Sequence, residues 1–170
     1  MRFFKNIDKE QQKNVANQFS WLLPWFEAMP DRTVELGLQR VSFSVFDHWL
    51  SEEEAYAALN KVDRSEQAAR DARFFKFAVS LSARSDMLAF TWRGQKHDVV
   101  RFRRFASAAA FFDPASRLGG MRNVVLPALD ALLTTGYDDT WDLIFRAKEQ
   151  IAVALDEAAN AGLYVLAGSG

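Results

Sequence analysis

The chain has 170 residues, of which 49% are hydrophobic and 25% charged, and its formal net charge is −1. This balance is typical of a globular protein and excludes a disordered or collagen-like chain. The absence of cysteine excludes disulfide bonds, thiolate zinc sites, iron–sulfur clusters and a cysteine nucleophile. We therefore expect one α+β domain over residues 1–167, large enough to fold without cross-links, with 168–170 as a flexible tail or a vector-derived remnant.

Residues 8–26 carry the signals of a helix. Asp8 followed by Gln11 resembles a capping box, and apolar residues then recur at helical spacing as far as Phe26. Pro24 should kink or end this helix, because proline clashes with the preceding turn. Apolar and polar residues alternate next, over 34–38 and again over 41–45, which predicts two strands or one bulged strand.

Two further helices are expected to begin at serine and aspartate caps. Ser51 with Glu54 forms a capping-box pattern, and a second helical segment should follow Asp63, with Glu66 at its third position. The alternation then returns, since Phe75, Phe77, Val79 and Leu81 share one strand face, and Leu88, Phe90 and Trp92 share another. With the polar turn 83–86 between them, these runs predict a β-hairpin.

The remaining elements are expected to complete a sheet of five to seven mostly antiparallel strands. A short strand near 100–102 should precede an alanine-rich helix, although a helix from Asp98 also fits the spacing. Pro127 suits the first turn of a short helix ending near Gly136. The last third is predicted to be β-α-β, with a strand at 141–145, a helix over 147–160 stopped by Gly162, and a strand at 163–166.

Two histidines are the only candidates for acid–base chemistry that the sequence suggests. His48 follows Asp47 and His97 precedes Asp98, but neighbours on a strand point to opposite faces, so neither pair is a ready dyad. Each histidine could instead be an ordinary surface residue. No metal site is expected from two histidines, and none of the standard phosphate-binding loops or nucleophile elbows is present, so no cofactor is expected.

Charge is distributed unevenly along the chain. The net charge is −3 over residues 1–60, +6 over 61–104 and −4 over 105–170. The densest acidic group, Asp138, Asp139 and Asp142 around Trp141, is a candidate partner-binding surface, or else a loop whose aspartates cap the next element. The basic group comprises Arg93, Lys96, Arg101, Arg103 and Arg104, interleaved with aromatic residues that could stack on bases, although the near-neutral pI disfavours nucleic acid.

These observations leave three functional hypotheses. The first is a non-catalytic protein-binding module, such as an immunity-type inhibitor of a cognate toxin, because fifteen Phe, five Trp and three Tyr suit interfaces as well as cores. The second is a small enzyme or ligand-binding domain with an aromatic-lined pocket and a histidine acid/base. The third is a nucleic-acid-binding protein. No run is long enough to span a membrane, and a cytoplasmic location is expected.

Overall fold

The computed structural model describes residues 3–28, 33–93, 99–116, 122–136 and 138–167. His97, Lys96 and the tail 168–170 lie outside these ranges. The elements of the described chain follow in the order β1 (Phe4–Asn6), α1 (Lys9–Gln18), α2 (Leu22–Ala28), β2 (Gln39–Ser44), α3 (Glu52–Asn60), α4 (Arg64–Arg84), β3 (Leu88–Arg93), β4 (Val99–Phe105), α5 (Ala108–Phe112), β5 (Asn123–Leu126), η2 (Pro127–Leu129), β6 (Ala131–Thr135), β7 (Thr140–Phe145), η3 (Lys148–Ile151), α6 (Ala152–Asn160) and β8 (Tyr164–Ala167).

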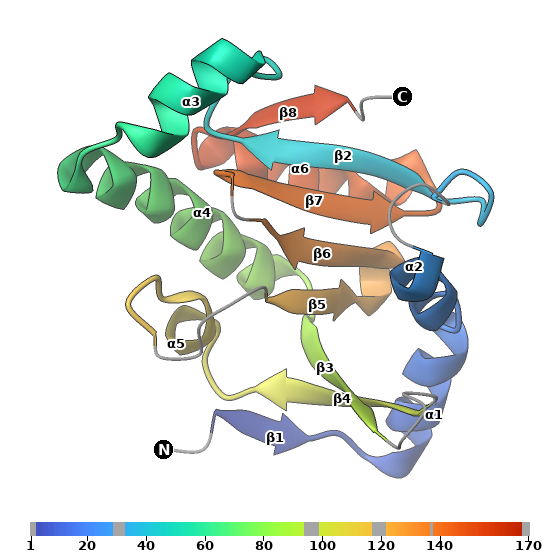
Figure 1. Ribbon diagram of the computed structural model, residues 1–170. Helices are drawn as coiled ribbons and strands as arrows, with labels where there is room; N and C mark the ends of the chain where they lie inside the picture. The colour runs from blue at the N-terminus through green and yellow to red at the C-terminus, as the bar shows by residue number, and fades with distance from the viewer. Residues whose placement is uncertain (1–2, 29–32, 94–98, 117–121, 137, 168–170) are drawn as a thin grey trace.

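The eight strands form one sheet in the order β1-β4-β3-β5-β6-β7-β2-β8 (Figure 1). Every neighbouring pair is antiparallel, which confirms the predicted α+β fold with a mostly antiparallel sheet. The strand number exceeds the expected five to seven. The C-terminal β-α-β unit is also present, as β7, α6 and β8, but β2 lies between its two strands.

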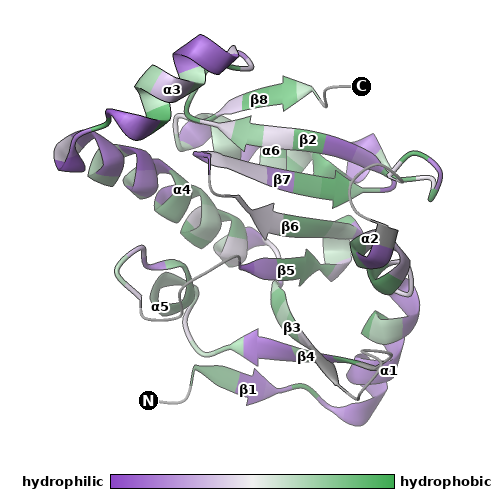
Figure 2. Ribbon diagram, in the orientation of Figure 1, coloured by the Kyte–Doolittle hydropathy of each residue, from purple (hydrophilic) through white to green (hydrophobic). Residues whose placement is uncertain are grey.

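Helices cover both faces of the sheet. We call the two sides the α4 face, covered by α4, α5 and α6, and the α1 face, covered by α1 and α2. Strand side chains alternate between two cores: Phe43, Leu133 and Leu143 belong to the α4 face, whereas Leu132 and Ile144 belong to the α1 face. Figure 2 shows hydrophobic residues concentrated in the central strands. Because α1 and α2 pack on the part of the sheet from β4 to β7, the α1 face is left uncovered by them near β2 and β8.

The predicted helix starts are confirmed by their caps. Asp8 accepts a hydrogen bond from the backbone N–H of Gln11, and Ser51 and Glu54 form the expected capping box of α3. The first helix breaks before Pro24, since α1 ends at Gln18 and α2 begins at Leu22. Proline at the third position of α2 is tolerated because its missing N–H would have no helical partner there.

The predicted hairpin over 75–92 is wrong in its first half. Residues 64–84 form one continuous helix, α4, capped by Asp63, and only β3 is a strand. The side chains that α4 buries are Phe74, Phe77, Ala78 and Leu81, together with Arg70, which follow the 3.6-residue period rather than the two-residue period.

Two other predicted elements are corrected, and one ambiguity is resolved. Residues 33–37 form a turn rather than a strand, and Val34 is 83% exposed. The helix expected from Pro127 to Gly136 ends after one turn at Leu129, and Asp130 in a left-handed conformation leads into β6. Residues 99–112 are a strand followed by a helix, β4 and α5, as expected.

Candidate functional site

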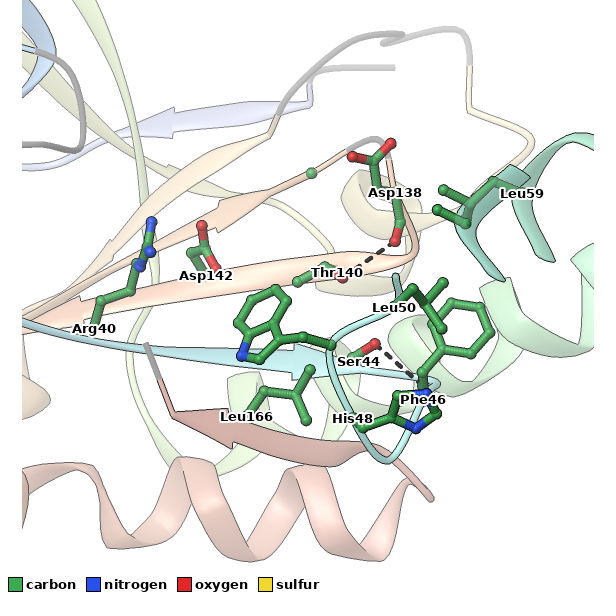
Figure 3. Close-up of a pocket in the computed structure, with 13 residues that line it drawn as sticks. Arg40, Ser44, Phe46, His48, Leu50, Leu59, Asp138, Thr140, Asp142 and Leu166 are labelled. Atoms are coloured by element: carbon green, nitrogen blue, oxygen red, sulfur yellow. Dashed lines mark hydrogen bonds between the residues drawn. The ribbon is translucent and has the colours of Figure 1, made fainter. Parts of the chain in front are cut away.

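A pocket of about 410 Å³ lies on the α1 face, at the end of the sheet that α1 and α2 do not cover (Figure 3). Its floor is made by β2, β7 and β8, and its wall by the segment 46–50 after β2, by α3, and by the β6–β7 turn. The lining residues are Arg40, Ser44, Phe46, His48, Trp49, Leu50, Ala55, Leu59, Gly136, Asp138, Thr140, Asp142 and Leu166.

The floor of the pocket is polar because polar and apolar side chains alternate along β2 and β7, and the polar ones face the pocket. On β2, Val41 and Phe43 face the α4 core, which places Arg40, Ser42 and Ser44 on the pocket side. Ser42 is directly opposite Asp142 on β7, and its Oγ donates a hydrogen bond of 2.5 Å to Oδ1 of the aspartate. The carboxylate of Asp142 is therefore held in place by a buried hydroxyl.

Two opposite charges stand next to each other on this floor. Arg40 is opposite Ile144 and is thus a diagonal neighbour of Asp142, and Figure 3 shows the two side chains rising on the same side of the sheet. Within the described part of the chain, neither forms a salt bridge. A ligand in the pocket can therefore meet one cation and one anion side by side.

Hydrogen bonds hold the wall of the pocket against the sheet. The indole N–H of Trp49 donates to the backbone carbonyl of Ala167 at 3.0 Å, which ties the loop to β8. Ser44 Oγ accepts a hydrogen bond from the backbone N–H of Phe46 at 3.1 Å. The reciprocal bonds between Ser51 and Glu54 fix the start of α3. Loop and helix thus form one braced wall.

His48 lies between two carboxylates. Its Nδ1 is 2.6 Å from Oδ1 of Asp47 and its Nε2 is 3.2 Å from Oε1 of Glu54. The hydrogen bond with Asp47, followed by that with Glu54, raises the pKa of His48 above 6.5. The pKa of Glu54 is lowered to about 2, first by the backbone N–H of Ser51 and then by the Ser51 and His48 side chains. Both ring nitrogens are engaged, so this imidazole links the loop to α3.

We expect the His48 ring to titrate with a midpoint above pH 6.5. NMR of the ring nitrogens measures this midpoint, once the signals of His48 have been distinguished from those of His97, the other histidine in the chain. Glu54→Gln should lower that midpoint, because one of the two carboxylates is removed. The raised pKa means that the link stabilises the fold below pH 6.5 and is lost as the pH rises through the higher, folded-state pKa. The interactions that lower the pKa of Glu54 stabilise the fold above pH 4.5, and this stabilisation is lost as the pH falls towards 2. A His48 midpoint that Glu54→Gln leaves unchanged would contradict this geometry.

The acidic group predicted from the sequence is divided between two sides of the sheet. Asp138 and Asp142 line the pocket. Trp141 is 9% exposed and stacks on Phe74 at 4.8 Å in the α4 core. Asp139 accepts hydrogen bonds of 2.9 Å from both Arg70 and Gln67 of α4. Only half of the group is thus available at this pocket.

The basic group is divided in the same way. Arg103 is opposite Ala89, and Arg104 is opposite Leu88, so the two arginines point to opposite faces. Arg104 pairs with Asp86 at 2.7 Å, while Arg101 donates to Asn6 at 2.6 Å. Arg93 ends β3, and the placement of its side chain is outside the described part of the chain, as is Lys96.

The polar pocket residues that the sequence did not suggest as candidates are Arg40, Ser44 and Thr140. The alternation of Arg40, Ser42 and Ser44 with apolar neighbours was visible in the sequence. This alternation predicts a strand but not a site, because nothing local shows which distant strand lies beside it.

The fold and the site together define an α+β protein with a polar, partly enclosed pocket on one face of its sheet. No family model, curated protein or solved structure matches the chain. Among the described residues, no helix has the length and apolar character to cross a membrane, and no three histidine or acidic side chains gather in a way that could hold a metal ion.

Proposed function

We propose that this chain is a non-catalytic protein-binding module whose partner docks at the pocket between β2, β7, β8 and α3. The observation that carries the proposal is the pair of neighbouring opposite charges on the pocket floor, Arg40 and Asp142, neither of which forms a salt bridge with a described residue, with Asp138 at the rim. Charges that lack an internal counterion are suited to complementary groups on a partner, where they give orientation and specificity.

The apolar rim of the pocket supports the same proposal. Trp49, Tyr56 and Tyr164 are each between 45% and 62% exposed. They lie on the loop, on α3 and on β8, the elements that surround the pocket, and Tyr164 is opposite the pocket residue Ser44. Exposed aromatic side chains are enriched in protein interfaces because they bury much area at little entropic cost. In the described chain β8 pairs only with β2, so its outer edge can accept an extended segment of a partner.

The surroundings of His48 favour binding over acid–base catalysis. A general base needs a free nitrogen within reach of the substrate, whereas both nitrogens of His48 contact carboxylates. A catalytic or ligand-binding alternative would have to use the floor of the pocket instead. The division of the basic group between two faces likewise weakens the case for a nucleic-acid interface.

A finer form of the proposal is an immunity-type inhibitor that neutralises a cognate toxin in the cytoplasm. A chain without cysteine suits that reducing compartment, and neutralisation by charge and shape needs no catalytic residue. If the partner has an activity, titration with this chain should abolish it at a one-to-one ratio. A bound partner whose activity is unchanged would exclude the inhibitor while leaving the binding proposal intact.

The binding proposal is tested with tagged protein in lysate of the native host. We expect one protein to be retained by the wild type and lost with Asp138→Lys combined with Tyr164→Ser, since this variant reverses a rim charge and removes a rim ring. Loss of affinity should be at least about tenfold, the effect of removing a well-placed interface residue.

The matched control is Asp156→Lys combined with Val34→Ser. Asp156 is exposed on α6, on the opposite side of the sheet, and Val34 is exposed in the turn before β2. This control changes the charge by the same amount and also removes one exposed apolar side chain. Retention that is equal in both variants would contradict docking at the pocket.

A further inference from the structure

A second cavity lies where the sheet divides. Strand β3 pairs with β4 over its full length but with β5 only at Leu88 and Ala89, so the two strands separate beyond that point. The cavity of about 290 Å³ at this place is lined by Phe4, Thr91, Arg101, Arg103 and Arg122, among others. It is on the α4 face near β1, at the other end of the sheet from the pocket described above.

Three guanidinium groups line this cavity without an acidic partner. Among the described residues, Arg101, Arg103 and Arg122 form no salt bridge. The acceptors that Arg101 and Arg122 do use are neutral, namely the side-chain oxygen of Asn6 at 2.6 Å and the backbone carbonyl of Asp113 at 3.2 Å. The cavity is therefore strongly positive.

Polar atoms at the cavity are buried without partners. The Nε atoms of Arg103 and Arg122 and the Oδ1 atom of Asn123 are buried and make no hydrogen bond to the described residues. Buried polar groups in native proteins are almost always paired, and an unpaired charged group is costly. Burial lowers the pKa of Arg122, which Asp113 only partly opposes. The fold itself therefore leaves the charge of this arginine cluster incompletely satisfied.

We propose that this cavity binds the phosphate group of a small phosphorylated molecule, held by Arg103 and Arg122 with Arg101 at its side. Guanidinium groups donate pairs of hydrogen bonds to phosphate oxygens, and the three positive charges more than balance the two negative charges of a phosphate dianion. The guanidinium of Arg103 lies 5.7 Å from the centre of the Phe4 ring, which gives the organic part of the ligand an aromatic neighbour.

The size of the cavity distinguishes this proposal from a nucleic-acid interface. A volume of this order holds one small molecule, whereas a polynucleotide needs an extended groove with several phosphate contacts. The site also does not depend on the protein-binding proposal, because the two sites share no lining residue.

The test is isothermal titration calorimetry with phenyl phosphate, inorganic phosphate and benzoate. We expect phenyl phosphate to bind most tightly, since it offers both the dianion and a ring. Arg103→Gln and Arg122→Gln should each weaken its binding by about tenfold or more, the effect of losing a charge-assisted hydrogen-bonding group.

The matched control is Arg104→Gln, which makes the same change one residue along β4 but on the opposite face, and it should leave the affinity unchanged. Circular dichroism would verify that each variant folds. If Arg122→Gln does not fold, Arg101→Gln takes its place in the test. Absence of binding to the wild type, or an equal loss of affinity in Arg104→Gln, would overturn the proposal. Tighter binding of benzoate than of phenyl phosphate would also overturn it.

Discussion

Replacing Phe77 with alanine should lower the free energy of unfolding by about 3–5 kcal/mol, the usual cost of removing a large buried ring. Phe77 is completely buried, and its ring centre lies 4.8 Å from that of Phe43 on β2 and 6.2 Å from that of Trp141 on β7. The surrounding strands are fixed by their pairing and cannot collapse into the space left behind. Urea unfolding followed by circular dichroism measures the loss.

Phe75→Ala is the matched control because it makes the same chemical change two residues earlier. In α4 the side chain of Phe75 is only partly buried at the margin of the core, so its loss should cost about 1–2 kcal/mol. In a strand, Phe75 and Phe77 would share one face and their substitutions would cost similar amounts. Equal losses would therefore contradict the helical structure of this segment.

The misreading of residues 75–82 shows where periodicity alone fails. Phe75, Phe77, Val79 and Leu81 alternate as in a strand, while Phe74, Phe77, Ala78 and Leu81 fit a helix equally well. The deciding signal is the segment before them. The cap at Asp63 begins a run without glycine or proline, and a helix once started continues at little cost until something stops it.

Helix starts were predictable because their signals are local. Asp8, Ser51 and Asp63 each accept a hydrogen bond from the backbone N–H three residues later, a contact within one helical turn. The strands β5 and β6 were missed for the opposite reason. They are buried on both faces of the sheet, so they show no alternation, and Pro127 between them resembled the start of a helix.

The pocket could not be predicted because it depends on which strands become neighbours. Ser42 and Asp142 are 100 residues apart in the sequence and are in contact only because β2 pairs with β7. His48 and Asp142 were both recognised as candidates, but as members of separate groups. The alternation within β7 then sends Trp141 into the core and Asp142 to the pocket, which a cluster of adjacent residues cannot show.

Substituting Asp139 with asparagine should lower the free energy of unfolding by about 3 kcal/mol, because it leaves a buried guanidinium without its main counterion. The side chains of Arg70 and Asp139 are only 9% and 10% exposed. Burial would lower the pKa of Arg70, but the hydrogen bonds to Asp139 and Glu66 raise it overall. Asparagine keeps the shape and tolerates the positive φ of 50° at this position, so the variant removes the charge with little added strain.

Asp138→Asn makes the identical change at the preceding residue, which is exposed, and should alter stability by no more than about 0.5 kcal/mol. The double variant Arg70→Met with Asp139→Asn should recover much of the loss, since an apolar side chain needs no counterion. Chemical unfolding of the wild type, of Arg70→Met, of Asp139→Asn and of the double variant gives the coupling energy between the two residues. If the double variant is less stable than Asp139→Asn alone, the arginine contributes through its other contacts, namely the Ala58 carbonyl and the Phe46 ring, more than through the aspartate. We therefore expect Asp139→Asn to be less stable than Asp138→Asn. Asp139 holds α4 against the β6–β7 turn, whereas Asp138 lies at the pocket, where it can meet a partner.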